Sequence, residues 1–408
     1  MDNSKLLTEE KLHIIREKQA NIPIIMEEEG IDCWMILVRE SASNPDPMQL
    51  LTIGGDVVWI SAFIYSLHQG QLHTTAMVGN FDVNAEREKK IWSEVIGYKE
   101  GISSLLFDYI TRLDPKVIAL NYSETDVVAD GLSHGLFQIV SKILAPFQSR
   151  FRSAEGLIRK LRGVKSPTEL AFIKQACAIT AEINTDMFHK LAPGMTEVEI
   201  QQEFHILMEN HGVTEAWQRD QCPMVDAGPN KELGHSGPLA SLRTQVGHTL
   251  HNDFGVRYHG YCSDIQRMWF FGRSADLPQE LRHAFDTVRE AIQRASNFIK
   301  PGVQGYEVDR ITREYVVSQG YSEYDHALGH QVGIDAHDGG TLLGPLWERY
   351  GNSPQGIVTI DNVFTLELEV DTDQYGTVSL EEMIRVTAEG CEFFLPPQLD
   401  FWYVTPTP

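Results

Sequence analysis

Apolar and polar residues alternate along two long segments in the second half of the chain, a pattern typical of antiparallel β-hairpins. The first segment, 248–271, is rich in aromatic and apolar residues and is interrupted by the stretch 257–260. The second consists of two apolar runs, 363–370 and 378–386, with a polar loop between them. Because a turn that joins two such runs brings them side by side, we expect two hairpins.

The first predicted hairpin carries one acidic residue on each strand. With its turn centred between Tyr258 and His259, Asp253 on one strand lies directly opposite Asp264 on the other. Like charges that face each other destabilise a sheet. A cation is therefore the expected partner of this pair.

The second predicted hairpin repeats this arrangement. Its loop is centred on Gln374, which places Glu367 directly opposite Glu381. The same register places Glu369, a second-choice ligand on the same face, opposite Ser379. Such a register holds only where neither strand bulges.

The first part of the chain is predicted to form a separate domain over residues 1–160. A charged helix that ends near Gly30 is followed by strand-like runs at 33–38 and 117–120. Helical patterns that alternate with strand-like runs are typical of an α/β domain.

Two helix-start signals precede the hairpins in the second predicted domain, 161–408. Ser166–Glu169 forms a capping box with proline at the first helical position. A second capping box, Thr196 with Glu199, starts a helix that ends by Gly212. The second predicted domain thus contains two helices followed by two hairpins.

The overall charge and the cysteines limit the possible partners and location. A formal net charge of −23 argues against nucleic acids and against an anionic membrane as partners. No apolar run approaches the ~20 residues of a membrane-spanning helix, and the N-terminal residues lack the pattern of a signal peptide. The five cysteines form no C-x-x-C pair, which indicates reduced thiols and a cytoplasmic location.

The acidic residues and a histidine between them lie in motifs that resemble those of the pita-bread metallopeptidases. This family includes aminopeptidase P, prolidase and methionine aminopeptidase, together with the metal-free creatinase. The resemblance covers most of the chain and is strongest from about Lys165 onward. The matching stretches are Asp253-Phe254-Gly255, Ser263-Asp264-Ile265-Gln266-Arg267, Gly329-His330-Gln331-Val332-Gly333, Thr365-Leu366-Glu367, and Glu381 with the following Val386-Thr387.

The resemblance implies an α/β N-terminal domain of the creatinase/prolidase type and an α+β pita-bread catalytic domain with a curved antiparallel sheet. It also implies two divalent metal ions, with manganese as the first candidate and zinc, cobalt or iron as alternatives. Asp264 and Glu381 would bridge both ions. Asp253 would bind one ion, and His330 and Glu367 would bind the other.

Further histidines match family positions that line the site. The resemblance assigns catalytic positions to His235, His326 and His337, whose imidazoles would stabilise an oxyanion or carry a proton to the leaving amine. His248 and His251 lie on the first strand of the first hairpin, and we interpret them as solvent-facing or supporting residues.

The implied function is that of a dinuclear metal-dependent hydrolase, a metallopeptidase of the Xaa-Pro aminopeptidase/dipeptidase type. A metal-bridging hydroxide would cleave the amide before proline in a short peptide or peptide-like substrate. The N-terminal domain, which methionine aminopeptidase normally lacks, favours the aminopeptidase P or prolidase type and implies a homodimer.

Several positions depart from the Xaa-Pro peptidase pattern, among them Gln331, which replaces a glycine, and Asp338, which replaces a glutamate. Two others bear on the substrate. Ser379 stands two residues before the last ligand, where these enzymes usually carry an arginine, and Glu369 replaces the glycine of a usual Glu-Pro-Gly sequence. A more acidic site leaves open a substrate with a cationic group, or a metal-dependent lyase or small-amide hydrolase on the same fold. A non-enzymatic binding protein is disfavoured because all five ligands are present.

Overall fold

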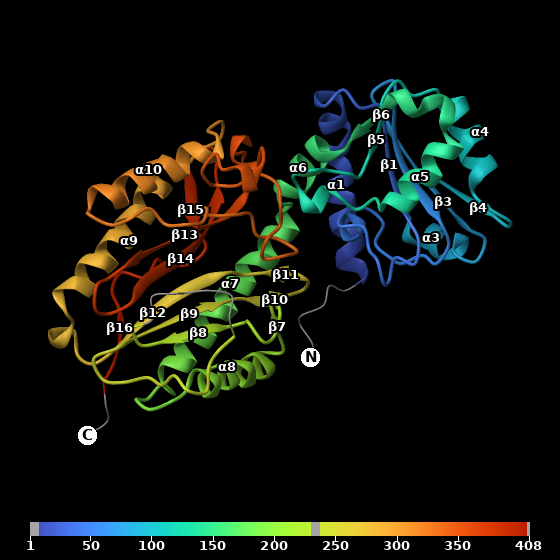
Figure 1. Cartoon of the computed structure of the whole chain (residues 1–408). Helices are drawn as coiled ribbons and strands as arrows, with labels where there is room; N and C mark the ends of the chain where they lie inside the picture. The colour runs from blue at the N-terminus through green and yellow to red at the C-terminus, as the bar shows by residue number, and fades with distance from the viewer. Residues whose placement is uncertain (1–7, 230–236, 406–408) are drawn as a thin grey trace. The chain divides into compact units, whose positions relative to one another are not determined.

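The computed structural model describes residues 8–229 and 237–405 of the chain (Figure 1). The chain divides into two compact units, of which one ends at Ser166 and the other begins at Pro167. Within the described residues, no helix combines the length and the hydropathy that are needed to cross a membrane.

The N-terminal unit is built on a six-stranded mixed sheet with the strand order β4-β3-β2-β1-β5-β6. Its strands are β1 (Cys33–Val38), β2 (Ser61–His68), β3 (Gln71–Gly79), β4 (Glu94–Tyr98), β5 (Ile118–Leu120) and β6 (Phe151–Ser153). Its α-helices are α1 (Thr8–Glu28), α2 (Gln49–Thr52), α3 (Val83–Lys89), α4 (Ser103–Leu113), α5 (His134–Ile143) and α6 (Glu155–Gly163). The predicted α/β architecture, with a helix before Gly30 and a strand at 33–38, is confirmed.

Helix α6 belongs to the N-terminal unit, although the sequence prediction divides the chain between residues 160 and 161. The reason is a buried cation: Lys18 Nζ donates to the carbonyl oxygens of Leu161 and Val164, at 2.9 and 2.7 Å. Because Lys18 is 1% exposed, these hydrogen bonds hold the end of α6 to helix α1.

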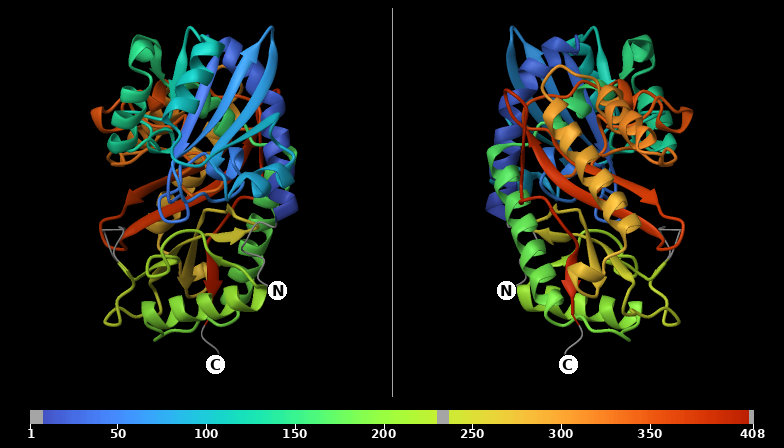
Figure 2. Two further views of the ribbon diagram at one scale, coloured as in Figure 1. Left: turned by 90° about the vertical axis from the view of Figure 1, so that its right-hand side faces the viewer. Right: turned by 90° about the vertical axis from the view of Figure 1, so that its left-hand side faces the viewer.

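The C-terminal unit has the predicted α+β pita-bread architecture, with helices behind strands that pair antiparallel except for β16 with β12. Its helices are α7 (Pro167–Phe188), α8 (Glu197–His211), α9 (Gln279–Phe298) and α10 (Gly305–Ser318). Its strands are β7 (Thr214–Glu215), β8 (Met224–Ala227), β9 (Thr249–Phe254), β10 (Val256–Tyr258), β11 (Tyr261–Cys262), β12 (Ile265–Phe271), β13 (Val363–Asp371), β14 (Thr377–Val386), β15 (Cys391–Phe393) and β16 (Trp402–Val404). Figure 2 shows α9 and α10, in orange, in front of the red strands β13 and β14 in its right-hand view.

Helix α8 begins and ends as its sequence predicts. Thr196 Oγ1 accepts from the backbone N–H of Glu199 at 3.1 Å, and the Glu199 carboxylate accepts from the backbone N–H of Thr196 at 2.8 Å. Gly212 follows the helix with φ +67°, a left-handed conformation that glycine adopts at low cost. The predicted capping box is therefore confirmed.

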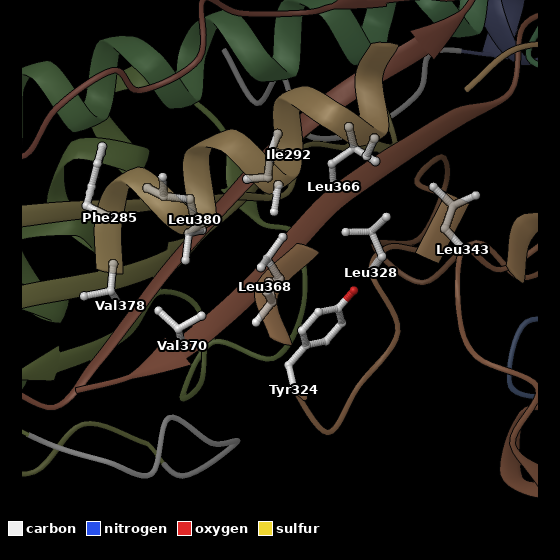
Figure 3. Packing of buried hydrophobic residues seen from close by; sticks show 14 of the residues in the cluster. Phe285, Ile292, Tyr324, Leu328, Leu343, Leu366, Leu368, Val370, Val378 and Leu380 are labelled. Atoms are coloured by element: carbon white, nitrogen blue, oxygen red, sulfur yellow. The ribbon is translucent and has the colours of Figure 1, made fainter. Parts of the chain in front are cut away.

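Strands β13 and β14 have one apolar and one polar face. Even-numbered residues such as Leu366, Leu368 and Leu380 pack against Phe285 and Ile292 of α9 (Figure 3). Each fully buried side chain of this size contributes roughly 1.5–3 kcal/mol. Since successive side chains of a strand point to opposite faces, the odd-numbered residues face away from this core.

Candidate metal centre

Hairpin β13–β14 has the register that its sequence predicts. Glu367 pairs with Glu381, and Glu369 pairs with Ser379. Both pairs lie on the polar face, opposite the apolar core behind the strands. Two carboxylates thus face each other directly on neighbouring strands.

The register of hairpin β9–β12 differs from the prediction by two residues. Asp253 pairs with Gln266 and not with Asp264. The turn consists of His259 and Gly260, whose φ angles of +46° and +82° are typical of a two-residue hairpin turn. The predicted centre was wrong because the preceding tyrosine still belongs to the strand. A shift of two residues leaves each side chain on its face, so Asp253 and Asp264 are diagonal neighbours.

His330 is brought to the site by pairing between the segment 329–331 and β13. Thr365 N donates to His330 O at 3.0 Å, and His330 N donates to Thr365 Oγ1 at 3.1 Å. A Cβ atom on Gly329 would stand 2.0 Å from Thr365 O, so only glycine permits this approach. The close approach of the two backbones therefore explains why a glycine precedes His330.

The five predicted ligand side chains converge on one site. One ligand atom of each of Asp264, His330 and Glu381 lies within 4.8 Å of the others. His330 Nε2 is 3.3 Å from Glu367 Oε1 and 3.9 Å from Asp264 Oδ2. The carboxyl group of Asp253 interacts electrostatically with Glu367 and His330.

Burial and mutual repulsion shift the pKa values of these groups. Burial raises the pKa of Asp253 to about 6. The pKa values of Asp264 and Glu381 lie well above their ordinary values, because burial and then the neighbouring carboxylates disfavour the charged form. Burial also opposes ionisation of Glu367, but the hydrogen bond to His330 and the electrostatic interactions with His330, His326 and His337 together outweigh it and lower the pKa of Glu367.

Three buried carboxylate oxygens of the proposed ligands have no hydrogen-bond partner among the described residues. They are both oxygens of Glu381, which is 1% exposed, and Oδ1 of Asp253. An unpaired charge in such surroundings is costly unless a cation binds it. Four carboxylates and one imidazole are suitable ligands for Mn²⁺, Co²⁺, Fe²⁺ or Zn²⁺, so the residues present fit divalent metal ions.

Two of the three predicted catalytic histidines lie beside these carboxylates. His326 and His337 both act electrostatically on Glu367. The ring of His337 lies 4.3 Å from that of His330, centroid to centroid, and His337 is exposed. His326 Nδ1 donates to the backbone carbonyl oxygen of the next residue at 2.7 Å, so its Nε2 is an acceptor. The third histidine, His235, lies outside the described residues.

A buried amide that sequence reasoning missed joins the two hairpins. Gln266 Nε2 donates to Glu367 Oε2 at 3.2 Å, and Gln266 Oε1 lies 3.1 Å from His251 Nε2. His251 Nδ1 lies 3.0 Å from Asp226 Oδ2. Because His251 is 4% exposed, it is not solvent-facing, and its interpretation as a supporting residue is the one that agrees with the structure. A turn placed at Gly260 would have put Gln266 opposite Asp253 and revealed it.

Ser379 and Glu369 form the next pair on the polar face of β13–β14. Ser379 Oγ contacts Gln266 Oε1 and Leu368 O, so its hydroxyl is used within the sheets. The carboxylate of Glu369 forms no hydrogen bond or ion pair with any described residue, and burial raises its pKa. The pair therefore leaves one acidic group available beside the proposed ligands.

Comparison with known proteins identifies relatives along nearly the whole chain. The sequence profile of metallopeptidase family M24 matches residues 171–388. An Xaa-Pro dipeptidase of Pyrococcus horikoshii is 24% identical over 383 residues, which is 93% of this chain and 97% of that protein. The uncharacterized peptidase YqhT of Bacillus subtilis is 28% identical over 234 residues, which is 57% of this chain and 62% of that protein.

Solved structures resemble the whole fold. The X-Pro aminopeptidase from Thermotoga maritima MSB8 matches with a TM-score of 0.70 and 24% identity, over 92% of this chain and 98% of that chain. An Xaa-Pro dipeptidase from Bacillus anthracis matches with a TM-score of 0.73 and 22% identity, over 96% of this chain and 99% of that chain. Both likenesses show that the two-unit fold is shared.

Proposed function

The chain belongs to metallopeptidase family M24, and on that premise we propose that it is a dinuclear hydrolase that cleaves the amide before proline in short peptides. The observation that carries this proposal is the convergence of four carboxylates and His330, with both oxygens of Glu381 unpaired. The names of the Pyrococcus horikoshii and Thermotoga maritima relatives support the preference for proline.

Each of the five ligands has a proposed place in this centre. Asp264 and Glu381 would bind both cations, Asp253 would bind one, and His330 and Glu367 would bind the other. Manganese is the first candidate, with zinc, cobalt or iron as alternatives. When bound, such cations supply Lewis-acid polarisation of a carbonyl and a water of lowered pKa.

The remaining side chains orient the substrate and move protons. The exposed imidazole of His337, beside His330, is placed to donate to the carbonyl oxygen on which negative charge develops. Nε2 of His326 is suited to take a proton from the attacking water and to pass it to the leaving amine. His235 keeps its proposed role from the family pattern.

A second candidate function follows from Glu369 and Ser379. The carboxylate of Glu369 has no partner among the described residues, and Ser379 provides no positive charge for a free peptide carboxylate. A substrate with a cationic group would complement Glu369. This pair favours a metal-dependent lyase or a small-amide hydrolase as the alternative.

The remaining parts of the proposal concern the domains, assembly and location. A division into an N-terminal domain and a catalytic domain, a homodimer and a cytoplasmic location complete it. The five cysteines are free, as a reducing compartment requires. Sedimentation of the purified protein would test the dimer.

Asp264→Ala tests the proposed centre. The wild-type protein is expected to bind up to two divalent ions per chain and to hydrolyse an Xaa-Pro peptide panel with Mn²⁺. The variant is expected to lose most of the metal and to turn over about 10³-fold more slowly, because it removes a ligand of both ions. Metal analysis and single-turnover assays give the two readouts.

Asp371→Ala is the matched control, since Asp371 lies on the same face of β13 but at its exposed end. It is expected to keep both metal and activity. Unchanged metal content in Asp264→Ala would contradict the site. Metal-loaded protein that cleaves cationic or small amides, but no Xaa-Pro peptide, would instead favour the second candidate.

A further inference from the structure

The side-chain amide of Gln266 links hairpin β9–β12 to hairpin β13–β14 within the proposed centre. Gln266 extends from β12, and its amide contacts Glu367 of β13, Ser379 of β14 and His251 of β9. It is 7% exposed, so protein groups rather than water satisfy its hydrogen bonds.

The orientation of this amide follows from its partners. A carboxylate only accepts, so the amide nitrogen of Gln266 must face Glu367 Oε2. The amide oxygen then faces the Ser379 hydroxyl, which donates to it, and lies 3.1 Å from His251 Nε2. Asp226 holds His251 through Nδ1. A flipped amide would place its oxygen against Glu367, so these partners fix one orientation.

The fixed amide determines which oxygen Glu367 presents to the centre. Glu367 Oε2 is occupied by Gln266, whereas Oε1 lies 3.3 Å from His330 Nε2. Glu381 differs, because neither of its oxygens has a partner among the described residues. A hydrogen bond from Gln266 therefore orients Glu367 before a cation binds.

We propose that Gln266 is a positioning residue that orients Glu367 for the cation shared with His330, and that Ser379 and His251 in turn orient Gln266. This inference rests on the proposed metal centre. It also gives Ser379 a role: its hydroxyl supports the amide that connects the hairpins. Residues that orient metal ligands in this way typically affect metal affinity 10–100-fold.

Gln266→Met tests the proposal, because methionine keeps the shape of the side chain and removes all its hydrogen bonds. Metal-stripped full-length protein is titrated with Mn²⁺, and free Mn²⁺ is followed by electron paramagnetic resonance. One of two Mn²⁺ sites is expected to weaken 10–100-fold, while the other stays within about threefold. The visible spectrum of the Co²⁺-loaded variant is expected to change as well.

Gln398→Met is the matched control. Gln398 is 4% exposed and bonds the backbone of Met268 in the same strand, but it contacts none of the five proposed ligands through its side chain. It is expected to lower the unfolding temperature as Gln266→Met does and to leave Mn²⁺ binding unchanged. Equal weakening by both variants would overturn the proposal, since general packing would then explain it.

Ser379→Ala keeps the test decisive if Gln266→Met does not fold. It removes one small hydroxyl, and it is expected to weaken the same Mn²⁺ site by a smaller factor. Unchanged binding in this variant would overturn the role of the amide. Wild-type protein that binds no Mn²⁺ would instead contradict the proposed function, so the two failures are distinguishable.

Discussion

The two hairpins of the C-terminal unit each present two carboxylates, but they position them differently. In β13–β14, Glu367 and Glu381 are directly opposite each other on facing strands. In β9–β12, Asp253 faces Gln266, and Asp264 is its diagonal neighbour. A direct pair brings two charges close together across the strands. In a diagonal pair, the position directly opposite each acid belongs to another residue, and opposite Asp253 that residue is the neutral Gln266.

The residues beside the ligands differ in the same way. Next to the acids of β9–β12 lie His251 and Gln266, which form hydrogen bonds with one another. Next to the acids of β13–β14 lies Glu369, which has no partner among the described residues. Hydrogen bonds thus support the acids of β9–β12, whereas Glu369 of β13–β14 forms no hydrogen bond or ion pair with a described residue and interacts only electrostatically with His326 and His251.

Close backbone contacts at Gly255 and Gly329 give the largest expected effect. A Cβ on Gly255 would stand 2.0 Å from Ser263 O, and one on Gly329 would stand 2.0 Å from Thr365 O. Alanine at either position should lower the free energy of unfolding by about 1–3 kcal/mol through overpacking. It should also abolish Mn²⁺ binding, because Asp264 or His330 is displaced. Denaturant unfolding and Mn²⁺ titration measure both effects.

Gly376→Ala is the control for these glycine variants. Gly376 has φ +80° at the end of β13–β14, so alanine there is expected to cost about 1–2 kcal/mol. No ligand moves, and Mn²⁺ binding should persist. If alanine at 255 and 329 also left binding intact, the close contacts would not be what positions the ligands.

The pH dependence of Mn²⁺ affinity is the next largest effect, and it distinguishes Asp253 of one hairpin from Glu367 of the other. The pKa of Asp253 is raised to about 6, whereas that of Glu367 is lowered. As pH falls from 7 to 5, protons compete for Asp253, and affinity should fall by about tenfold per pH unit for each proton displaced. Asp253→Asn should flatten this slope below pH 6, as isothermal titration at several pH values would reveal.

The metal-free protein should show the opposite dependence in its stability. Because the pKa of Asp253 is higher in the folded state than its ordinary value, its stabilising contribution is complete below about pH 4 and is lost as pH rises through about 6. Asp253→Asn should remove this loss. Thermal unfolding in a chelating buffer that showed the same pH profile for both proteins would contradict the assignment.

Glu369→Gln should give the smallest effect. A partly exposed ion pair contributes roughly 0.2–1 kcal/mol, so the KM of a cationic substrate should rise up to about fivefold with kcat unchanged. Neutral substrates and Asp371→Asn serve as controls and should show no change. An equal rise for neutral and cationic substrates would mean that Glu369 supports the site without meeting the substrate.

The strands and one of the two registers could be predicted because local patterns encode them. The long alternation around Glu367 and Glu381 has a symmetrical polar loop, so its centre is defined. The turn in 257–260 was predicted one residue too early, and the positive φ angles of His259 and Gly260 show where it lies. The sequence carried one signal for this position, which is the glycine at the second residue of the turn.

Contacts between segments that are distant in the sequence could not be predicted from local sequence patterns. His330 reaches Glu367 because Gln331 pairs with Phe364 of β13, across more than thirty positions of sequence. The link between Gln266 and Ser379 likewise depends on how two hairpins pack. Motif resemblance predicted that the ligands meet, but it carried no information on the side chains that hold them.

The two faces of β13 have a consequence for how new specificities arise. Even-numbered residues are constrained by the packing against α9, whereas odd-numbered residues carry charge and ligands. Mutations at even-numbered positions must therefore preserve the packing against α9, whereas mutations at odd-numbered positions need not. A lineage or a mutant library can vary position 369 without altering the core. Adaptation to new substrates is thus accessible one residue at a time.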